Sequence, residues 1–218
     1  IAVRCDPERT ILLPSSNPPT IVRAIPSLDG DACDELAIAT PDDDASGSNR
    51  GSVRIFKGCQ PNATWTALTA EGNNRRMGSG DLLIDDLTGD GALDLAVGSV
   101  SYDDGPRDIG AVWFAPHDAL IAFDNTASGY DLSALTTEIA SVPAARIQGI
   151  HENDAFGRSL SRIGDRLLIG RNGPQGAGGL EGWELDANGF VGRSLFIAGE
   201  APWSGLATSQ AADGSRLL

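Results

Sequence analysis

The nine-residue segment Asp86–Asp94 contains the strongest chemical signal in the sequence. Ca²⁺ takes about six to eight oxygen ligands, and a tight loop supplies them when carboxylates recur at alternate positions. Gly91, at position 6 of the segment, permits the sharp turn that such a loop needs. We therefore predict a Ca²⁺ site here, the alternative being a plain Asp-Gly hairpin turn. The expected ligands at positions 1, 3, 5, 7 and 9 are Asp86, Thr88, Asp90, the carbonyl of Ala92, and Asp94.

A second segment, Ser27–Glu35, repeats the pattern less completely. Position 1 lacks a carboxylate, and Ala32 stands where glycine is expected. We expect a second but poorer Ca²⁺ site, whose ligands would be Ser27, Asp29, Asp31, the carbonyl of Cys33, and Glu35. The corresponding segment Ile163–Arg166 has too few oxygens and is predicted to be a plain turn. These ions would have a structural role, because a ligand that binds only the folded state stabilises it.

Residues arranged for catalysis are not apparent. The two histidines, His117 and His151, lie in polar, turn-like contexts. Gly157–Ser161 lacks the final glycine of a nucleophile elbow. Gly176–Glu181 resembles a phosphate-binding loop, but no helix is expected after it. We predict a protein that is not an enzyme.

Short apolar strands that recur along the chain must position the acidic loops. Ala39 and Gly98 are as far apart in the chain as Gly51 and Gly110, so two landmarks share one spacing. A further short strand follows in each unit, and the 27 glycines suit the tight turns between strands. Each unit is therefore expected to contain four short strands. The expected strands are 36–41, 95–100 and 167–171; 51–56, 110–114 and 179–183; 66–70, 145–149 and 195–199; and 156–161. The one helix candidate, Leu132–Ile139, is short.

This combination resembles the FG-GAP repeat of integrin α-subunit propellers. The matching features are the Phe156-Gly157 pair, the acidic loop Asp86–Asp94, the Leu-Ala-Val-Gly strand at 95–98, and the Gly-x-Val strand that begins at Gly110. The Phe-Gly pair is literal only at this one place. The resemblance covers about residues 20–218 and implies an all-β fold, a β-propeller of four-stranded antiparallel blades. It also implies Ca²⁺ as the bound ion.

The chain is interpreted as a single propeller region, residues 1–218. It would consist of an N-terminal segment (1–19), blades at about 20–70, 71–149 and 150–199, and the start of a fourth blade at 200–218. Propellers of this type generally have seven blades, and three cannot close a ring. We therefore expect a fragment of a longer chain, the alternative being a ring completed by another chain.

The net charge of −14 argues against nucleic acid and anionic membranes as partners. A transmembrane helix is not expected either, since no run of about 18 apolar residues occurs. The resemblance implies an extracellular or cell-surface location, with a protein ligand or a neighbouring subunit as partner. The expected function is protein interaction or adhesion; the alternatives are an accessory domain of a larger secreted enzyme and a structural subunit of an extracellular assembly.

Several further features concern the loops. Cys33 and Cys59 are predicted to lie at the same end of one sheet, where they could form a disulfide, although Cys5 could take either partner. An insertion is expected between about Pro116 and Pro143, and Asn62 begins a glycosylation sequon. The resemblance implies that ligands bind at the opposite end, where the loops are 41–48, 101–105 and 171–176. Asp42–Asp44 in the first of these is predicted to be a solvated run.

Overall fold

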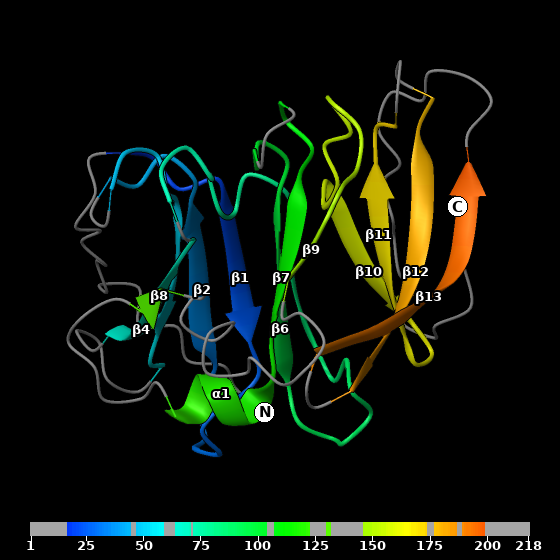
Figure 1. The fold of residues 1–218 in the computed structure, drawn as a ribbon. Helices are drawn as coiled ribbons and strands as arrows, with labels where there is room; N and C mark the ends of the chain where they lie inside the picture. The colour runs from blue at the N-terminus through cyan, green and yellow to red at the C-terminus, as the bar shows by residue number, and fades with distance from the viewer. Residues whose placement is uncertain are drawn as a thin grey trace.

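The computed structural model describes residues 17–44, 47–58, 64–70, 72–103, 107–122, 130–131, 146–173, 177–186 and 189–198. This part of the chain is all-β and contains three antiparallel four-stranded sheets that follow one another along the sequence (Figure 1). In each sheet the strands lie side by side in chain order. A closed ring is not formed by the described residues.

The strands of the three sheets have the following bounds. Sheet 1 consists of β1 (Ile21–Ile25), β2 (Glu35–Thr40), β3 (Ser52–Phe56) and β4 (Thr64–Thr69), and the two-residue strand β8 (Tyr130–Asp131) pairs in parallel with β4. Sheet 2 consists of β5 (Leu82–Asp85), β6 (Asp94–Ser99), β7 (Ala111–Ala115) and β9 (Arg146–Gln148). Sheet 3 consists of β10 (Ser159–Ile163), β11 (Arg166–Arg171), β12 (Gly179–Asp186) and β13 (Gly189–Ala198).

Each strand range predicted from the sequence overlaps an observed strand, but the starts of β10 and β13 are shifted and one helix is additional. The strand expected from residue 195 begins at Gly189. The strand expected from Phe156 begins at Ser159, because Phe156 forms an isolated bridge with Gly110 of the preceding sheet. The helix α1 (His117–Ala122) was not predicted. It begins directly after Pro116, whose carbonyl accepts its first hydrogen bonds, and it is too short to show a helical period. The candidate helix Leu132–Ile139 lies outside the described residues.

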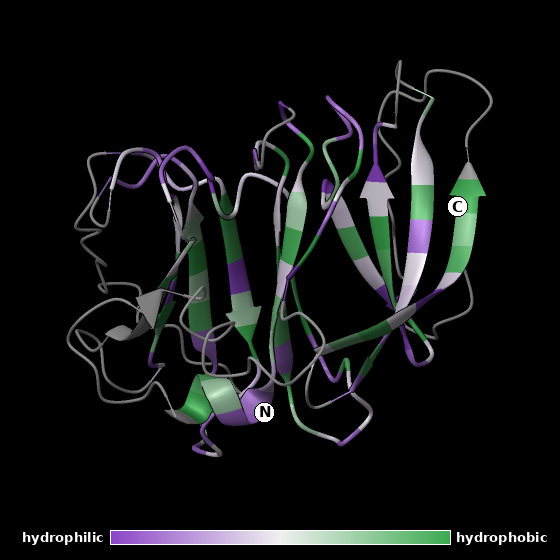
Figure 2. Cartoon of the chain, in the orientation of Figure 1, coloured by the Kyte–Doolittle hydropathy of each residue, from purple (hydrophilic) through white to green (hydrophobic). Residues whose placement is uncertain are grey.

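The hydrophobic core lies between the sheets as two clusters. Sheet 2 contributes to both clusters, because alternate residues of a strand point to opposite faces. All residues of β6 and β7 are buried, and Figure 2 shows hydrophobic residues along these strands and polar residues in loops at both ends of the sheets. The first cluster includes Ala37, Ala39, Val53 and Ile55 of sheet 1 with Leu95, Val97 and Trp113 of sheet 2. The second includes Ala96, Val112 and Phe114 of sheet 2 with Leu160, Leu167 and Ile169 of sheet 3.

A glycine joins each pair of neighbouring sheets in the same way. Gly51, just before β3, bridges Met77, and Gly110, just before β7, bridges Phe156. Both glycines have a φ of +75°. A Cβ on Gly110 would lie 2.2 Å from the backbone nitrogen of Phe156, so no other residue fits there without movement. The two sheet junctions therefore have one repeated geometry.

Small residues near the ends of the second strands allow a second close approach. The N–H of Gly78 donates to Gly98 O (3.0 Å), and the N–H of Gly157 donates to Gly170 O (3.2 Å). A Cβ on Gly98 would lie only 2.0 Å from Gly157 O. At Gly98 the absence of a side chain is therefore required, because the segment that leads into sheet 3 crosses sheet 2 there.

Candidate metal centres

Both acidic loops link the first and second strands of a sheet and share an anchor. The N–H of Leu28 donates to Glu35 Oε2 (2.5 Å), and the N–H of Leu87 donates to Asp94 Oδ2 (2.9 Å). In each loop the last acid is also the first residue of the second strand. The two loops therefore use the same local frame, as their aligned sequences predict.

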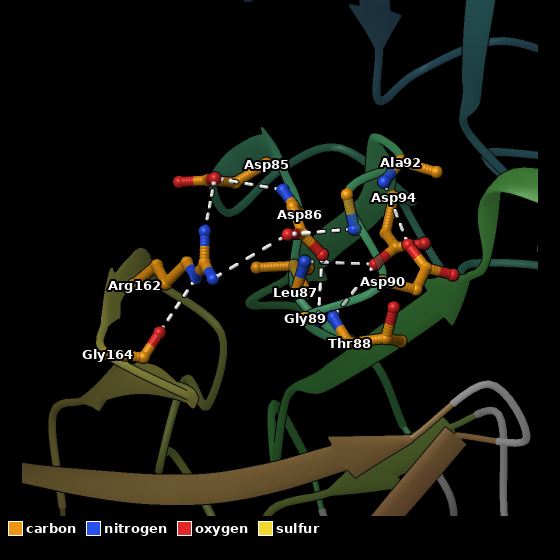
Figure 3. A network of polar contacts seen from close by, with 11 residues as sticks. Asp85, Asp86, Leu87, Thr88, Gly89, Asp90, Ala92, Asp94, Arg162 and Gly164 are labelled. Atoms are coloured by element: carbon orange, nitrogen blue, oxygen red, sulfur yellow. Dashed lines mark hydrogen bonds and ion pairs between the residues drawn. The ribbon is translucent and has the colours of Figure 1, made fainter.

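In loop 86–94 the half-buried carboxylate of Asp86 and the exposed carboxylate of Asp90 accept hydrogen bonds from the backbone of the loop itself (Figure 3). Asp86 accepts from the N–H groups of Gly89 (2.7 Å) and Gly91 (3.1 Å). Asp90 accepts from the N–H of Ala92 (2.8 Å). Each of these two predicted ligands thus already has backbone donors.

Asp94 is fully buried and holds the loop to its surroundings. Its Oδ2 accepts from the N–H groups of Leu87 and Thr88, and its Oδ1 accepts from the N–H of His117 (2.9 Å). Burial raises the pKa of Asp94, an effect that outweighs the lowering by these hydrogen bonds. The contact with His117 places the start of the predicted insertion against this loop.

A guanidinium from sheet 3 also reaches loop 86–94. Arg162 of β10 lies with one terminal nitrogen 2.9 Å from Asp85 Oδ1 and the other 3.9 Å from Asp86 Oδ2. Its Nε donates to the carbonyl of Gly164 (2.8 Å), as Figure 3 shows. The first predicted metal ligand of this loop therefore has a cation beside it.

Loop 27–35 brings three carboxylates together. One oxygen each from Asp29, Asp31 and Glu35 lie within 4.8 Å of one another, and no other such group occurs within the described ranges. Asp29 and Asp31 are exposed, whereas Glu35 is 1% exposed. The buried Oε1 of Glu35 has no hydrogen-bond partner in the described part of the chain. This is the arrangement that a bound cation would complete.

The electrostatics of Glu35 reflect the same crowding. Burial raises the pKa of Glu35, and the charges of Asp29 and Asp31 raise it further, against the lowering effect of the Leu28 N–H. A counter-ion lies at the side of the cluster, where Lys57 Nζ is 3.9 Å from Asp29 Oδ2.

The remaining predicted ligands of loop 27–35 shape its backbone. Ser27 Oγ donates to the carbonyl of Asp31 (2.5 Å), and the N–H of Cys33 donates to Asp31 Oδ1 (2.6 Å). Gly91 in the other loop has a φ of +88°, whereas Ala32 is not among the described residues with positive φ. The sequence favours loop 86–94, but the carboxylates converge in loop 27–35.

The third corresponding turn is plain, as predicted. Ile163 pairs with Arg166 across a two-residue turn in which Gly164 has a φ of +60°.

The prediction that Asp42–Asp44 is a solvated run is wrong for Asp43. Asp43 is 3% exposed and accepts hydrogen bonds from Ser52 Oγ (2.5 Å) and from the guanidinium of Arg54. Ser52 and Arg54 are two residues apart on β3 and so point to the same face. An arginine within this short apolar strand was the sequence feature that could have predicted a buried ion pair.

The predicted cysteine pairing and glycosylation site fall mostly outside the described residues. Cys5, Cys59 and Asn62 all lie there. Gly58 does lie against Cys33, since a Cβ on Gly58 would be 2.7 Å from Cys33 Cβ. The Cys33–Cys59 disulfide stays a prediction, which this proximity supports.

Comparison with known proteins adds no family assignment. No protein-family model and no curated protein sequence matches the chain. Within the described residues, no helix has both the length and the apolar character needed to cross a bilayer.

Proposed function

We propose that this chain is a calcium-stabilised, non-catalytic part of an extracellular β-propeller that mediates protein interaction or adhesion. The observation that carries the calcium assignment is the unpartnered Oε1 of Glu35, buried beside Asp29 and Asp31. Three carboxylates this close repel one another, and a buried acceptor without a donor costs free energy. A divalent cation in this position would relieve both effects.

The chemistry of the ligands favours Ca²⁺ over softer metals. The cluster offers only oxygen atoms, and it lies on a loop that has backbone carbonyls nearby. Zinc and copper prefer nitrogen and sulfur ligands, whereas Ca²⁺ accepts oxygen ligands in irregular geometry and completes its shell with water.

The repeated sheet junction supports the propeller. Gly51 with Met77 and Gly110 with Phe156 join successive sheets through the same parallel bridge. A unit that contacts its neighbours through a constant junction can be added repeatedly, which is how propellers are built. The role in protein interaction rests on the resemblance to integrin-type propellers.

Calcium-dependent stability tests the metal assignment. Saturating Ca²⁺ at roughly 100 times its Kd should stabilise the fold by about 2.7 kcal/mol. For a chain of this size that is a rise of roughly 5–10 °C in Tm over the value in chelator. Glu35→Gln should abolish the rise, because it removes the buried anionic ligand. Asp34→Asn is the matched control, since Asp34 is exposed on the same loop and lies outside the cluster.

Thermal melts in chelator and in excess Ca²⁺, with calorimetric titration, would measure the effect. A wild-type Tm that is the same in both solutions would contradict the proposal. Equal losses of the Ca²⁺ response in the Glu35 and Asp34 variants would contradict the assignment to this cluster.

A further inference from the structure

We propose that the guanidinium of Arg162 takes the place of a metal ion at loop 86–94. It keeps that loop free of metal at Ca²⁺ concentrations that fill loop 27–35. The inference rests on the proposed calcium function and specifies which loop takes the ion. It reverses the order that the ligand spacing predicts.

The position of Arg162 is fixed from three sides. Asp85 Oδ1 lies 2.9 Å from one terminal nitrogen, Asp86 Oδ2 lies 3.9 Å from the other, and the Gly164 carbonyl accepts from Nε. The Arg162 side chain is only 25% exposed, so solvent screens these charges less than it would at a free surface. A guanidinium stays charged at all relevant pH values and needs no metal from solution.

A metal at loop 86–94 would place a second cation beside the carboxylate that Arg162 approaches. Asp86 could keep the N–H groups of Gly89 and Gly91, but the metal would repel the nearby guanidinium. The acids of this loop also do not converge as the acids of loop 27–35 do. The guanidinium of Arg162 therefore already supplies positive charge to Asp85 and Asp86, whereas Thr88 Oγ1 is the predicted ligand that is buried without a hydrogen-bond partner in the described part of the chain.

Loop 27–35 receives no such cation from the next sheet. In sheet 3, Leu160 pairs with Ile169, and Arg162 lies two residues further along the strand. In sheet 2, Leu82 pairs with Val97, so the equivalent position is Ile84. Ile84 packs against the first core cluster and has no charge to offer.

The counter-ion that loop 27–35 does have is weaker. Lys57 directly follows β3 of the same sheet, and its Nζ lies 3.9 Å from Asp29 Oδ2. Asp31 and Glu35 form no ion pair within the described part of the chain. A metal ion at loop 27–35 would therefore neutralise carboxylates that have no ion pair in the described part of the chain. At loop 86–94 a metal ion would compete with Arg162.

Calcium stoichiometry tests the proposal. Equilibrium dialysis of the full chain against Ca²⁺ should give one bound equivalent for the wild type. Arg162→Gln should bind a second equivalent, at least roughly tenfold more tightly than any second binding step of the wild type. Adding Asp90→Asn to Arg162→Gln should remove that second equivalent and so locate it. The control Arg166→Gln removes an arginine of the same hairpin, whose partners are Asp165 and Glu184, and should bind as the wild type does.

Two outcomes would overturn the role of Arg162: two equally tight sites in the wild type, or unchanged binding in Arg162→Gln. If the wild type binds no Ca²⁺ and Arg162→Gln binds one equivalent, the Arg162 proposal stands and the loop 27–35 assignment fails. If circular dichroism shows that Arg162→Gln does not fold, Arg162→Met replaces it, because methionine keeps the aliphatic part of the side chain and removes the charge. A second equivalent in Arg162→Met would then support the proposal, and wild-type binding would overturn it.

Discussion

At the scale of single residues, Glu35 combines burial with two neighbouring negative charges. Both effects raise the pKa of its carboxyl above the ordinary value of 4.5. Without metal, the folded chain therefore binds more protons than the unfolded chain between pH 4.5 and the raised pKa. Stability then falls as pH rises through that window, because the unfolded state releases its proton first.

The upward shift of the Glu35 pKa predicts a pH dependence of stability that can be tested. In chelator, the Tm of the wild type should decrease as pH rises from about 4.5 through the raised pKa of Glu35. Glu35→Gln should show a smaller decrease, because glutamine does not titrate. Asp94, whose pKa is also raised, contributes equally to both proteins, so the difference isolates Glu35. Parallel Tm curves for the two proteins would contradict this reading.

The residues of the candidate site were predictable to the extent that they are local in sequence. Alternate acids in one loop predicted the convergence of Asp29, Asp31 and Glu35. Arg162 was not predictable, because it reaches Asp86 from another sheet and no periodicity relates the two. The sequence favoured loop 86–94 because of its ligands and Gly91, and it contained no sign of the cation beside the loop.

At the scale of elements, the sheet junctions depend on glycine for two separate reasons. Gly110 has a positive φ and also has the backbone of Phe156 where a side chain would be. Gly164 has a similar φ of +60° in the β10–β11 turn, but open space surrounds it. The two positions therefore separate backbone strain from close packing.

Gly110→Ala should destabilise the fold by about 3 kcal/mol or more, because the second junction must open to admit the methyl group. Gly164→Ala should cost only about 1–2 kcal/mol, the cost of a left-handed alanine. Denaturant unfolding of both variants measures the difference. Equal decreases in the free energy of unfolding of the two variants would show that the junction accepts the methyl group without additional strain.

The strands were predictable because their apolar residues recur with one spacing, whereas α1 was not. Its six residues are fewer than two helical turns, and its burial depends on Leu120 entering the first core cluster. The start of β10 was misplaced because Phe156 pairs with the preceding sheet instead of continuing its own strand. Both differences arise from contacts between units, which a single-unit pattern does not contain.

At the scale of the whole molecule, sheet 2 supplies one face to each of the two core clusters. Phe114 packs toward sheet 3 and Trp113 packs toward sheet 1, from adjacent positions on β7. Loss of packing on one face of sheet 2 should therefore weaken more than one sheet.

Phe114→Ala should cost about 3–5 kcal/mol and lower amide protection in both sheet 2 and sheet 3. Phe196→Ala is the control, because Phe196 is 47% exposed at the edge of sheet 3, and its loss should cost about 1 kcal/mol or less. Hydrogen exchange followed by mass spectrometry resolves the sheets separately. Loss of protection confined to sheet 2 would show that the sheets open independently.

The pairing of β8 with β4 has a consequence for synthesis of the chain. Leu68 and Thr69 receive their partners, Tyr130 and Asp131, from a segment made after the first three strands of sheet 2. A nascent chain leaves the ribosome from its N-terminus, so the end of β4 emerges before β8. Until β8 emerges, the backbone groups of Leu68 and Thr69 on this edge of sheet 1 are unpaired. Open strand edges invite pairing with other chains. The order of translation thus places an interval of exposure to misassembly between the emergence of residue 69 and that of residue 131.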